Sequence, residues 1–181
     1  MERSRLVFSG SGGQGVITAA IILAKAAAIF EEKNAVQSQS YGAAARGGST
    51  RSDILISDAE INFPKVIQPN ILVCLTQESY NKFSPILRPG GLLLVDSKYV
   101  TIEKKVDAKH ICLPMYETVM EKIKKPIVFN ICMLGALIGI SQLVKPDSIL
   151  KVLETTIPKD FMTMNKTALE LGFQMGEAAE L

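Results

Sequence analysis

Short apolar runs alternate with helix-forming segments along the first two-thirds of the chain. Residues 16–28 are rich in Ala, Ile and Leu and are apolar on nearly every face, which predicts a helix buried against a sheet. This alternation is typical of an α/β domain with a Rossmann-like, mostly parallel sheet flanked by helices. The runs interpreted as strands are residues 5–9, 34–38, 52–57, 70–76, 92–96 and 110–113.

The pattern after residue 114 is helical. The most apolar run, residues 127–144, is marginal in length for a membrane span, which needs ~20 apolar residues, and it is interrupted by Asn130 and Ser141. We therefore expect a buried helix and a cytoplasmic protein without a membrane segment. The expected helices of this helical C-terminal third are residues 115–124, 128–143, 146–156 and 160–172.

One hairpin is also predicted. The strand at residues 52–57 is followed by Asp58-Ala59, a turn signal, and by a short second strand at residues 60–63 that Pro64 stops.

Composition limits the classes of function. At 181 residues with 48% hydrophobic residues, the sequence fits one globular domain, residues 1–181. A net charge of +2, without a basic cluster interleaved with aromatic residues, argues against nucleic-acid binding. Cys74, Cys112 and Cys132 form no C-x-x-C pair and each lies in an apolar run, so we expect small buried hydrophobic residues. No metal site, iron–sulfur cluster or catalytic constellation is expected in this chain.

A glycine-rich turn follows the first predicted strand. Its residues are Gly10, Gly12, Gly13, Gln14 and Gly15, and the glycines match G-x-G-x-x-G. A strand, a glycine turn and a helix in this order direct backbone N–H groups and the positive end of the helix dipole at an anion. We expect Gly10 to permit the tight turn, Gly12 and Gly13 to allow close approach of a ligand or another chain, and Gly15 to permit close helix-on-strand packing.

A dinucleotide site also needs a carboxylate at the end of the second strand. Residues 34–38 run into Gln39-Ser40-Tyr41 without an acid, and Glu31 and Glu32 precede that strand, where they close the helix. The sequence thus weakens the NAD interpretation, although a free-standing nucleotide-binding protein or dehydrogenase remains an alternative.

A second loop rich in small residues follows the second strand. Residues 40–48 contain Tyr41, Gly42, Arg46, Gly47 and Gly48, and six of the nine are Gly or Ala. An arginine followed by two glycines suits bidentate binding of a phosphate or carboxylate. We expect this loop to face the glycine turn, because loops at the carboxyl ends of neighbouring parallel strands meet in one crevice, with Arg46 and Arg51 as its strong cations.

The two loops together resemble the gamma subunit of the 2-oxoacid:ferredoxin oxidoreductases. The resemblance covers nearly the whole chain in order, with one departure: members often have Pro-Glu where this chain has Ala43-Ala44. The further motifs that carry it are Ser57-Asp58-x-Glu60-Ile61, Leu87-x-Pro89-Gly90-Gly91, Asn130-x-x-x-Leu134-Gly135-Ala136 and Asn165-x-x-Ala168-x-x-x-Gly172.

This resemblance implies a non-catalytic subunit of a multisubunit enzyme. The family oxidatively decarboxylates a 2-oxoacid on thiamine diphosphate, passes electrons through iron–sulfur clusters to ferredoxin and forms an acyl-CoA. Sister subunits, alpha, beta and in some members delta, hold the thiamine and the clusters. The separate short chain most resembles the 2-oxoglutarate branch, with the pyruvate, ketoisovalerate and indolepyruvate enzymes as alternatives.

The resemblance also implies that this chain helps to seat coenzyme A. The N–H groups of residues 12–15 and the guanidinium groups of Arg46 or Arg51 suit its phosphates, and Tyr41 offers an aromatic face or a hydroxyl group. A sister subunit pressed against Gly42, Gly47 and Gly48 is an equally open use of the same surface. Whether the isolated chain forms a homodimer is left open.

Overall fold

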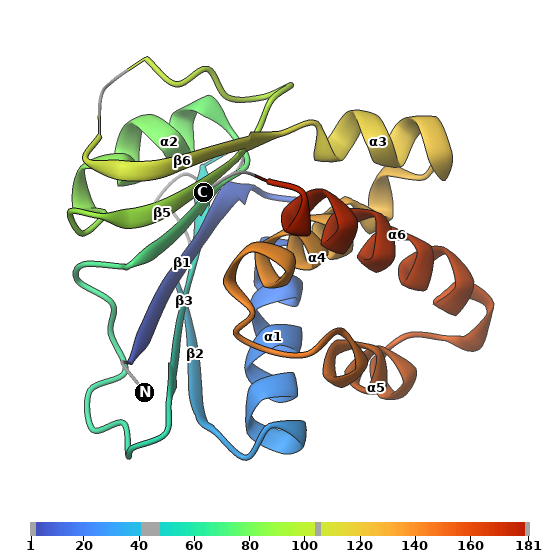
Figure 1. Cartoon of the computed structure of the whole chain (residues 1–181), viewed down its shortest axis with the longest axis horizontal. Coiled ribbons are helices and arrows are strands. Elements are labelled where there is room, and N and C mark those ends of the chain that lie inside the picture. The colour runs from blue at the N-terminus through green and yellow to red at the C-terminus, as the bar shows by residue number, and fades with distance from the viewer. Residues whose placement is uncertain (1–2, 41–47, 104–105, 180–181) are drawn as a thin grey trace.

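The computed structural model describes residues 3–40, 48–103 and 106–179. These residues form a six-stranded sheet in the order β2-β3-β1-β4-β5-β6 (Figure 1). The strands are β1 (Ser4–Ser11), β2 (Asn34–Ser40), β3 (Ser49–Ser57), β4 (Ile71–Cys74), β5 (Gly91–Asp96) and β6 (Ala108–Leu113).

The sheet is mostly parallel, with one exception. β1 pairs in parallel with β4, β4 with β5, and β5 with β6. β3 runs antiparallel to both of its neighbours, β1 and β2, and separates those two strands. The β1–β3 register places Ser11 opposite Ser49. The first residue of β3 therefore lies beside the last residue of β1, at the same end of the strands.

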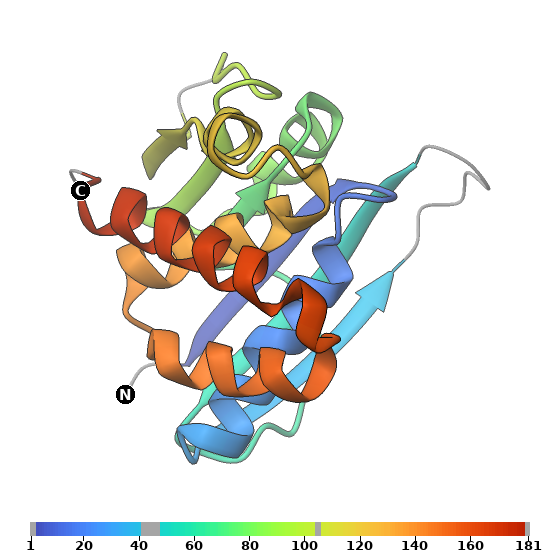
Figure 2. The same cartoon turned by 90° about the vertical axis from the view of Figure 1, so that its right-hand side faces the viewer.

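Helices cover both faces of the sheet unequally. In Figures 1 and 2 α1, α4, α5 and α6 lie on one face, while α2 packs on the other. The first run of small and branched residues forms α1, and the last helices form a layer over it. The helices are α1 (Val16–Phe30), α2 (Gln77–Phe83), α3 (Met115–Lys122), α4 (Phe129–Ser141), α5 (Pro146–Thr156) and α6 (Lys159–Glu177).

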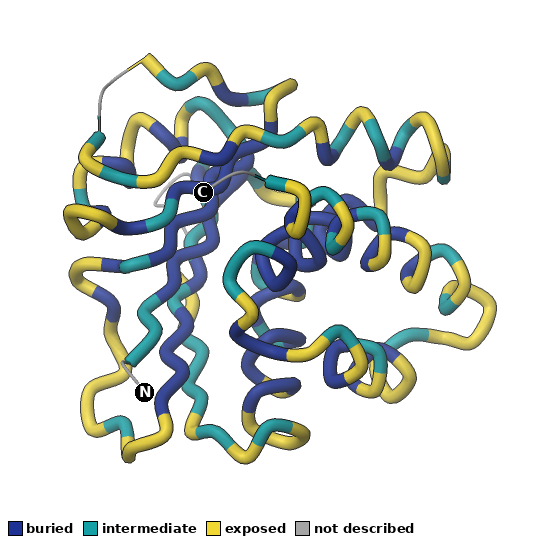
Figure 3. Tube along the Cα trace, in the orientation of Figure 1, coloured by how far each residue is buried: buried dark blue, intermediate teal, exposed yellow. Residues whose placement is uncertain are grey.

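The core has two parts because alternate strand residues point to opposite faces. Leu6 and Phe8 of β1 pack with α1 and α4, whereas Val7 packs with Tyr80 and Phe83 of α2. Figure 3 shows the buried segments concentrated in the central strands and in α1 and α4. The larger core lies between the sheet and the helical layer.

Two glycine pairs bring α4 and α6 into backbone contact. A Cβ at Gly172 of α6 would meet the carbonyl oxygen of Cys132, and one at Gly135 of α4 would meet that of Leu169. Gly139 and Gly176 repeat the arrangement one turn further along. The helices can lie this close because none of the four positions has a side chain.

The α/β class, the mostly parallel sheet and the helical C-terminal third are confirmed. The predicted hairpin is wrong, since residues 60–63 form no strand. The reason is that β1 and β2 already occupy both edges of β3, which leaves no hydrogen-bonding edge for a further strand.

The expected helix boundaries are nearly correct, except that α6 continues to Glu177 and a 3-10 helix, Pro126–Val128, precedes α4. Within the described ranges, none of the helices combines the length and apolar character needed to cross a bilayer.

Candidate functional site

The glycine turn begins at the end of β1, and Gly10 is still part of the strand. A Cβ at Gly10 would lie 2.5 Å from Oε1 of Gln14 and 3.0 Å from Cγ2 of Val16. Gly10 was expected to permit the tight turn, but it lies in the strand before the turn. Its missing side chain makes room for the side chain of Gln14.

Gln14 holds the turn against the neighbouring strand. Its Oε1 accepts a hydrogen bond from the backbone N–H of Ser11 at 2.8 Å, and its Nε2 donates to the carbonyl oxygen of Leu75 at 3.2 Å. Because Leu75 follows β4, this amide links the ends of β1 and β4 and fixes the shape of the loop.

The last part of the turn needs glycine for its backbone conformation. Gly13 and Gly15 have φ angles of 88° and 72°, in the left-handed region that other residues rarely adopt. Gly15 is the N-cap residue of α1, and no side chain in the described part of the chain caps that end. The first N–H groups of α1 therefore lack the side-chain acceptor that many helices provide.

Open space adjoins this helix start. A Cβ at Gly12 or Gly13 would meet nothing within 4 Å, and both residues are exposed. A cavity of about 400 Å³ lies beside them, lined also by Gly15, the first residues of α1 and Thr50 of β3. The turn thus presents unobstructed backbone to a hollow, which is an arrangement that can receive an anion.

Asn130 supports Gly15 from the helical layer. Its Nδ2 donates to the carbonyl oxygen of Gly15 at 3.2 Å, and a Cβ at Gly15 would lie 2.5 Å from that nitrogen. The close packing predicted for Gly15 is therefore against α4 rather than a strand. The side chain is only half satisfied, since its buried Oδ1 has no partner among the described residues. Sequence reasoning missed this contact, because 115 positions separate the two residues.

A second cavity of about 400 Å³ adjoins Gly13 and Gly15 on the helical side. Its lining is mainly apolar and includes Ile127 and Phe161, whose exposed fractions are 74% and 47%. Large apolar side chains seldom stay so exposed together beside a cavity without a ligand or partner.

The residues that flank the second loop, Ser40 and Gly48, lie at the same end of the sheet as the glycine turn. Tyr41, Gly42, Arg46 and Gly47 lie outside the described residues, but Ser40, Gly48 and Ser49 flank them. Ser40 ends β2, and the half-buried Gly48 precedes Ser49, the partner of Ser11. The expectation that this loop leaves the strand next to β1 is wrong, because β3 lies between β1 and β2.

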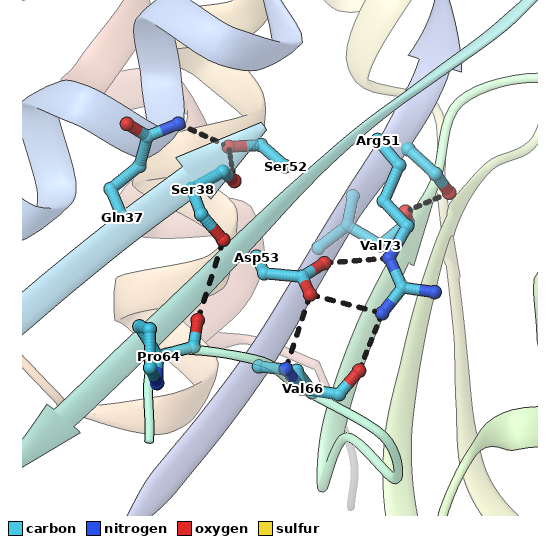
Figure 4. Close-up of polar contacts among 9 residues, drawn as sticks. Gln37, Ser38, Arg51, Ser52, Asp53, Pro64, Val66 and Val73 are labelled. Carbon is cyan, nitrogen blue, oxygen red and sulfur yellow. Dashed lines mark hydrogen bonds and ion pairs between the residues drawn. The ribbon is translucent and has the colours of Figure 1, made fainter. Parts of the chain in front are cut away.

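Arg51 is engaged within the fold rather than presented to a ligand. Figure 4 shows its guanidinium between Asp53 and Val66. Nε lies 2.6 Å from Oδ1 of Asp53, and Nη2 donates to Asp53 Oδ2 at 3.1 Å and to the Val66 carbonyl oxygen at 2.6 Å. The sequence pattern suggested that Arg51 offers its charge to a ligand beside the glycine turn. These internal contacts argue against that interpretation.

Glu31 has a structural role as well. Its Oε1 accepts hydrogen bonds from the backbone N–H of Lys145 at 2.9 Å and the hydroxyl group of Ser148 at 2.6 Å, at the start of α5. The bond from Ser148 is the main reason that the pKa of Glu31 lies below its usual value. This carboxylate stabilises the N-terminus of α5 and is not placed to bind a ribose.

Asp96 is a fully buried carboxylate at the end of β5. It accepts hydrogen bonds from the N–H groups of Lys98 at 3.0 Å and Tyr116 at 2.8 Å. Burial raises its pKa, and these two bonds offset part of the effect. Asp96 thus joins β5 to the start of α3.

The cysteines do not gather into a site. Cys74 and Cys132 are buried, and burial raises the pKa of each thiol to about 12. Cys112 is exposed on the edge strand β6, which corrects the expectation that all three are buried. Across residues 3–40, 48–103 and 106–179, no three His, Cys, Asp or Glu side chains lie together as a metal site. These donors do not fit an iron–sulfur cluster, which needs about four thiolate ligands.

Known proteins match this chain over almost its whole length. The family model described as pyruvate ferredoxin/flavodoxin oxidoreductase matches residues 5–175. The 2-oxoglutarate synthase subunit KorC of Methanocaldococcus jannaschii is 43% identical over 177 residues, which are 97% of this chain and 95% of the relative. The pyruvate synthase subunit PorC of Methanothermobacter marburgensis is 33% identical, with 92% of this chain and 94% of the relative covered.

Solved structures agree with these matches. The gamma subunit of a keto/oxoacid ferredoxin oxidoreductase from Geobacter sulfurreducens superimposes with a TM-score of 0.91 at 37% identity, covering 100% of both chains. A 2-oxoglutarate:ferredoxin oxidoreductase from Magnetococcus marinus has a TM-score of 0.88 and covers 99% of this chain and 32% of its own. At 18% identity this second match shows the fold alone.

The resemblance found in the sequence motifs is therefore confirmed over the whole fold. The chain belongs to the pyruvate ferredoxin/flavodoxin oxidoreductase family and is a gamma subunit of a 2-oxoacid:ferredoxin oxidoreductase.

Proposed function

We propose that this chain serves a 2-oxoglutarate:ferredoxin oxidoreductase in the cytoplasm, together with alpha, beta and, where present, delta subunits. Support for the 2-oxoglutarate branch comes from the 43% identity to a 2-oxoglutarate synthase subunit, against 33% to a pyruvate synthase subunit. The test is the ratio of kcat/KM values of the assembled complex for 2-oxoglutarate, pyruvate and 2-oxoisovalerate, with ferredoxin as acceptor. A higher value for pyruvate would overturn the branch assignment.

Within the complex, this chain contributes the glycine turn to the seat of coenzyme A. The observation that carries this proposal is the uncapped start of α1 beside an open cavity, with Gly12 and Gly13 exposed. Phosphate groups bind well at such a helix start, because the unpaired N–H groups and the helix dipole both favour negative charge. The Magnetococcus enzyme of the same fold has coenzyme A bound.

The other candidate residues have defined parts in this proposal. Gly12, Gly13 and Gly15 offer their backbone to the phosphates, while Gln14 keeps the turn in shape through its two hydrogen bonds. Arg46 supplies charge, and Tyr41 packs on the adenine or bonds to it. The apolar cavity on the other side of Gly13 suits the pantetheine arm, which carries methyl groups and amides.

A charge placed at Gly12 tests this role directly. The Gly12 position has open space and no positive φ, so the Gly12→Asp and Gly12→Asn variants both fit the fold. The two side chains are nearly equal in size and differ in charge, and a carboxylate beside the phosphates raises the KM for coenzyme A about ten-fold above that of the Asn variant. The KM for the 2-oxoacid stays unchanged. Equal KM values for coenzyme A in the two variants would show that the glycine turn does not contact coenzyme A.

Arg46→Ala tests the second loop in the same assay. We expect a higher KM for coenzyme A with an unchanged KM for the 2-oxoacid, since one charge-assisted contact is lost. An unchanged KM for coenzyme A would exclude Arg46 from the seat. Size-exclusion chromatography of each variant complex checks that assembly is intact.

A docking role for the same region is a second candidate, favoured by the exposed Ile127 and Phe161 beside the apolar cavity. In this alternative, Gly42, Gly47 and Gly48 let a sister subunit approach closely. Phe161→Ser and Gly48→Ala then reduce assembly of the complex, measured by co-purification, while coenzyme A affinity of the remaining complex stays the same.

A further inference from the structure

A basic cavity lies at the opposite end of the sheet from the glycine turn. It has a volume of about 560 Å³, and Arg3, Arg5 and Arg88 line it together with Lys65. The sequence contains only five arginines, at positions 3, 5, 46, 51 and 88, so three of them share this one cavity. Such a concentration is unexpected in a chain whose net charge is only +2.

Among the residues that the structure describes, the lining of this cavity is basic. None of the described residues that line it is Asp or Glu. The side chains of Arg5 and Lys65 make no hydrogen bond or ion pair with other described residues, and Arg3 donates only to the backbone oxygen of Glu60, at 3.0 Å. The positive charges of Arg5 and Lys65 are therefore unpaired among the described residues, and a bound anion relieves the repulsion between them.

The fold separates this cavity from the proposed coenzyme A seat. Arg5 lies near the start of β1, which runs Ser4–Ser11, and the glycine turn follows its end. Six residues of extended strand span about 20 Å. Arg5 also projects to the face that carries α2, because Val7, two positions further on, belongs to that core. The cavity is therefore a distinct site.

An aromatic and an apolar side chain accompany the cations. Phe63 and Ile67 line the same cavity and are 54% and 73% exposed. Both come from the segment between β3 and β4, which the sequence pattern wrongly predicted to contain a strand. An exposed ring beside arginines is the combination that holds a base by stacking while the phosphates bind to guanidinium groups.

We propose that this cavity binds a nucleoside diphosphate or a closely related nucleotide. Arg3, Arg5 and Arg88 bind the phosphates, Lys65 adds charge, and Phe63 stacks on the base. The volume lies in the range of small-molecule sites. The cations converge in one hollow instead of forming a stripe, so a compact anion fits better than an extended nucleic acid.

Isothermal titration of the full chain, and of the assembled complex, with ADP and with inorganic diphosphate tests the proposal. Both probes bind the natural chain, and Arg5→Gln weakens both about ten-fold or more, because a charged hydrogen-bonding partner is lost. Lys25→Gln removes the same charge from an exposed position on α1 and leaves both affinities unchanged. Phe63→Ala weakens ADP binding about five-fold or more and leaves diphosphate binding unchanged.

The Gly12→Asp variant separates this site from the coenzyme A seat, since ADP is also part of coenzyme A. In the proposed arrangement the Gly12→Asp variant retains the ADP binding that Arg5→Gln weakens. Three results overturn the proposal: absence of saturable binding, affinities that Arg5→Gln leaves unchanged, or ADP binding that only Gly12→Asp abolishes. Binding of an acidic peptide such as poly-glutamate in preference to ADP would assign the cavity to a protein partner instead.

Discussion

At the scale of single residues, Gly15 allows a direct test of what the turn requires. The Gly15→Ala variant forces a side chain into a backbone with φ 72° and places its Cβ 2.5 Å from Nδ2 of Asn130. The conformational cost is about 1–2 kcal/mol, and crowding against α4 adds about 1–3 kcal/mol. We expect the free energy of unfolding, measured with urea, to fall by about 3 kcal/mol.

Gly90 provides the matched control. It has the same φ of 72°, but a Cβ there would meet nothing within 4 Å. Gly90→Ala therefore measures the conformational cost alone, about 1–2 kcal/mol. Adding Asn130→Ala should remove most of the difference between the two alanine variants. Equal losses for Gly15→Ala and Gly90→Ala would show that α4 does not restrict the turn.

Roles of single residues were only partly predictable from the sequence. The glycine pattern correctly indicates a turn between β1 and α1, because a left-handed backbone needs glycine locally. The contacts of Asn130 and Glu31 depend on residues brought together by the fold, whereas Arg51 pairs with Asp53 two positions away. Asn130 reaches Gly15 across 115 positions and Glu31 reaches Ser148 across 117, and no local pattern records such pairs.

At the scale of elements, the contact between α4 and α6 depends on glycine at both helices. In the Gly172→Ala variant the new methyl group meets the backbone of Cys132, which cannot rotate away as a side chain can. The helices must separate, at a cost of about 3 kcal/mol, even though Ala is intrinsically the better helix former. Thermal and urea unfolding should both show this loss.

Lys166→Ala on the exposed side of α6 is the control for that experiment. Its ammonium group makes only a 4.0 Å ion pair with Glu170, so its removal should change the free energy of unfolding by less than about 0.5 kcal/mol. A neutral effect of Gly172→Ala would mean that the two helices tolerate a wider separation.

Helices could be predicted because their sequence pattern is local. The prediction of a strand was wrong where pairing required a free hydrogen-bonding edge on another strand. The apolar run at 128–143 and the segment 146–156 indicate helices that the structure places within a few residues. The expected strand at residues 60–63 failed because strand pairing depends on which edges are free, and β3 has none. The basic cavity was not predictable from local patterns, because it combines the start of β1 with the loops before β4 and β5.

At the scale of the whole molecule, strand order bears on the rival nucleotide-binding interpretation. A Rossmann-type NAD site needs the end of the second strand, with its carboxylate, next to the glycine turn. Here β3 lies between β1 and β2, so β2 is two strand spacings, about 10 Å, from β1. The mostly parallel sheet followed from the sequence pattern, but the inserted antiparallel strand did not.

This topology leads to the last prediction, that the full chain does not bind NAD or NADH at the glycine turn. β2 ends in Gln39-Ser40 without an acid, and Glu31 is committed to the start of α5. The ribose hydroxyl groups therefore lack their usual acceptor at the turn. In the Arg5→Gln variant, whose basic cavity is weakened, we expect Kd values above about 1 mM by fluorescence titration with NADH. The natural chain titrated in parallel shows how much the basic cavity contributes to NADH binding. NADH binding below about 10 μM that survives Arg5→Gln and is lost in Gly12→Asp would contradict the prediction, because it would show that a dinucleotide can use this turn without the neighbouring carboxylate.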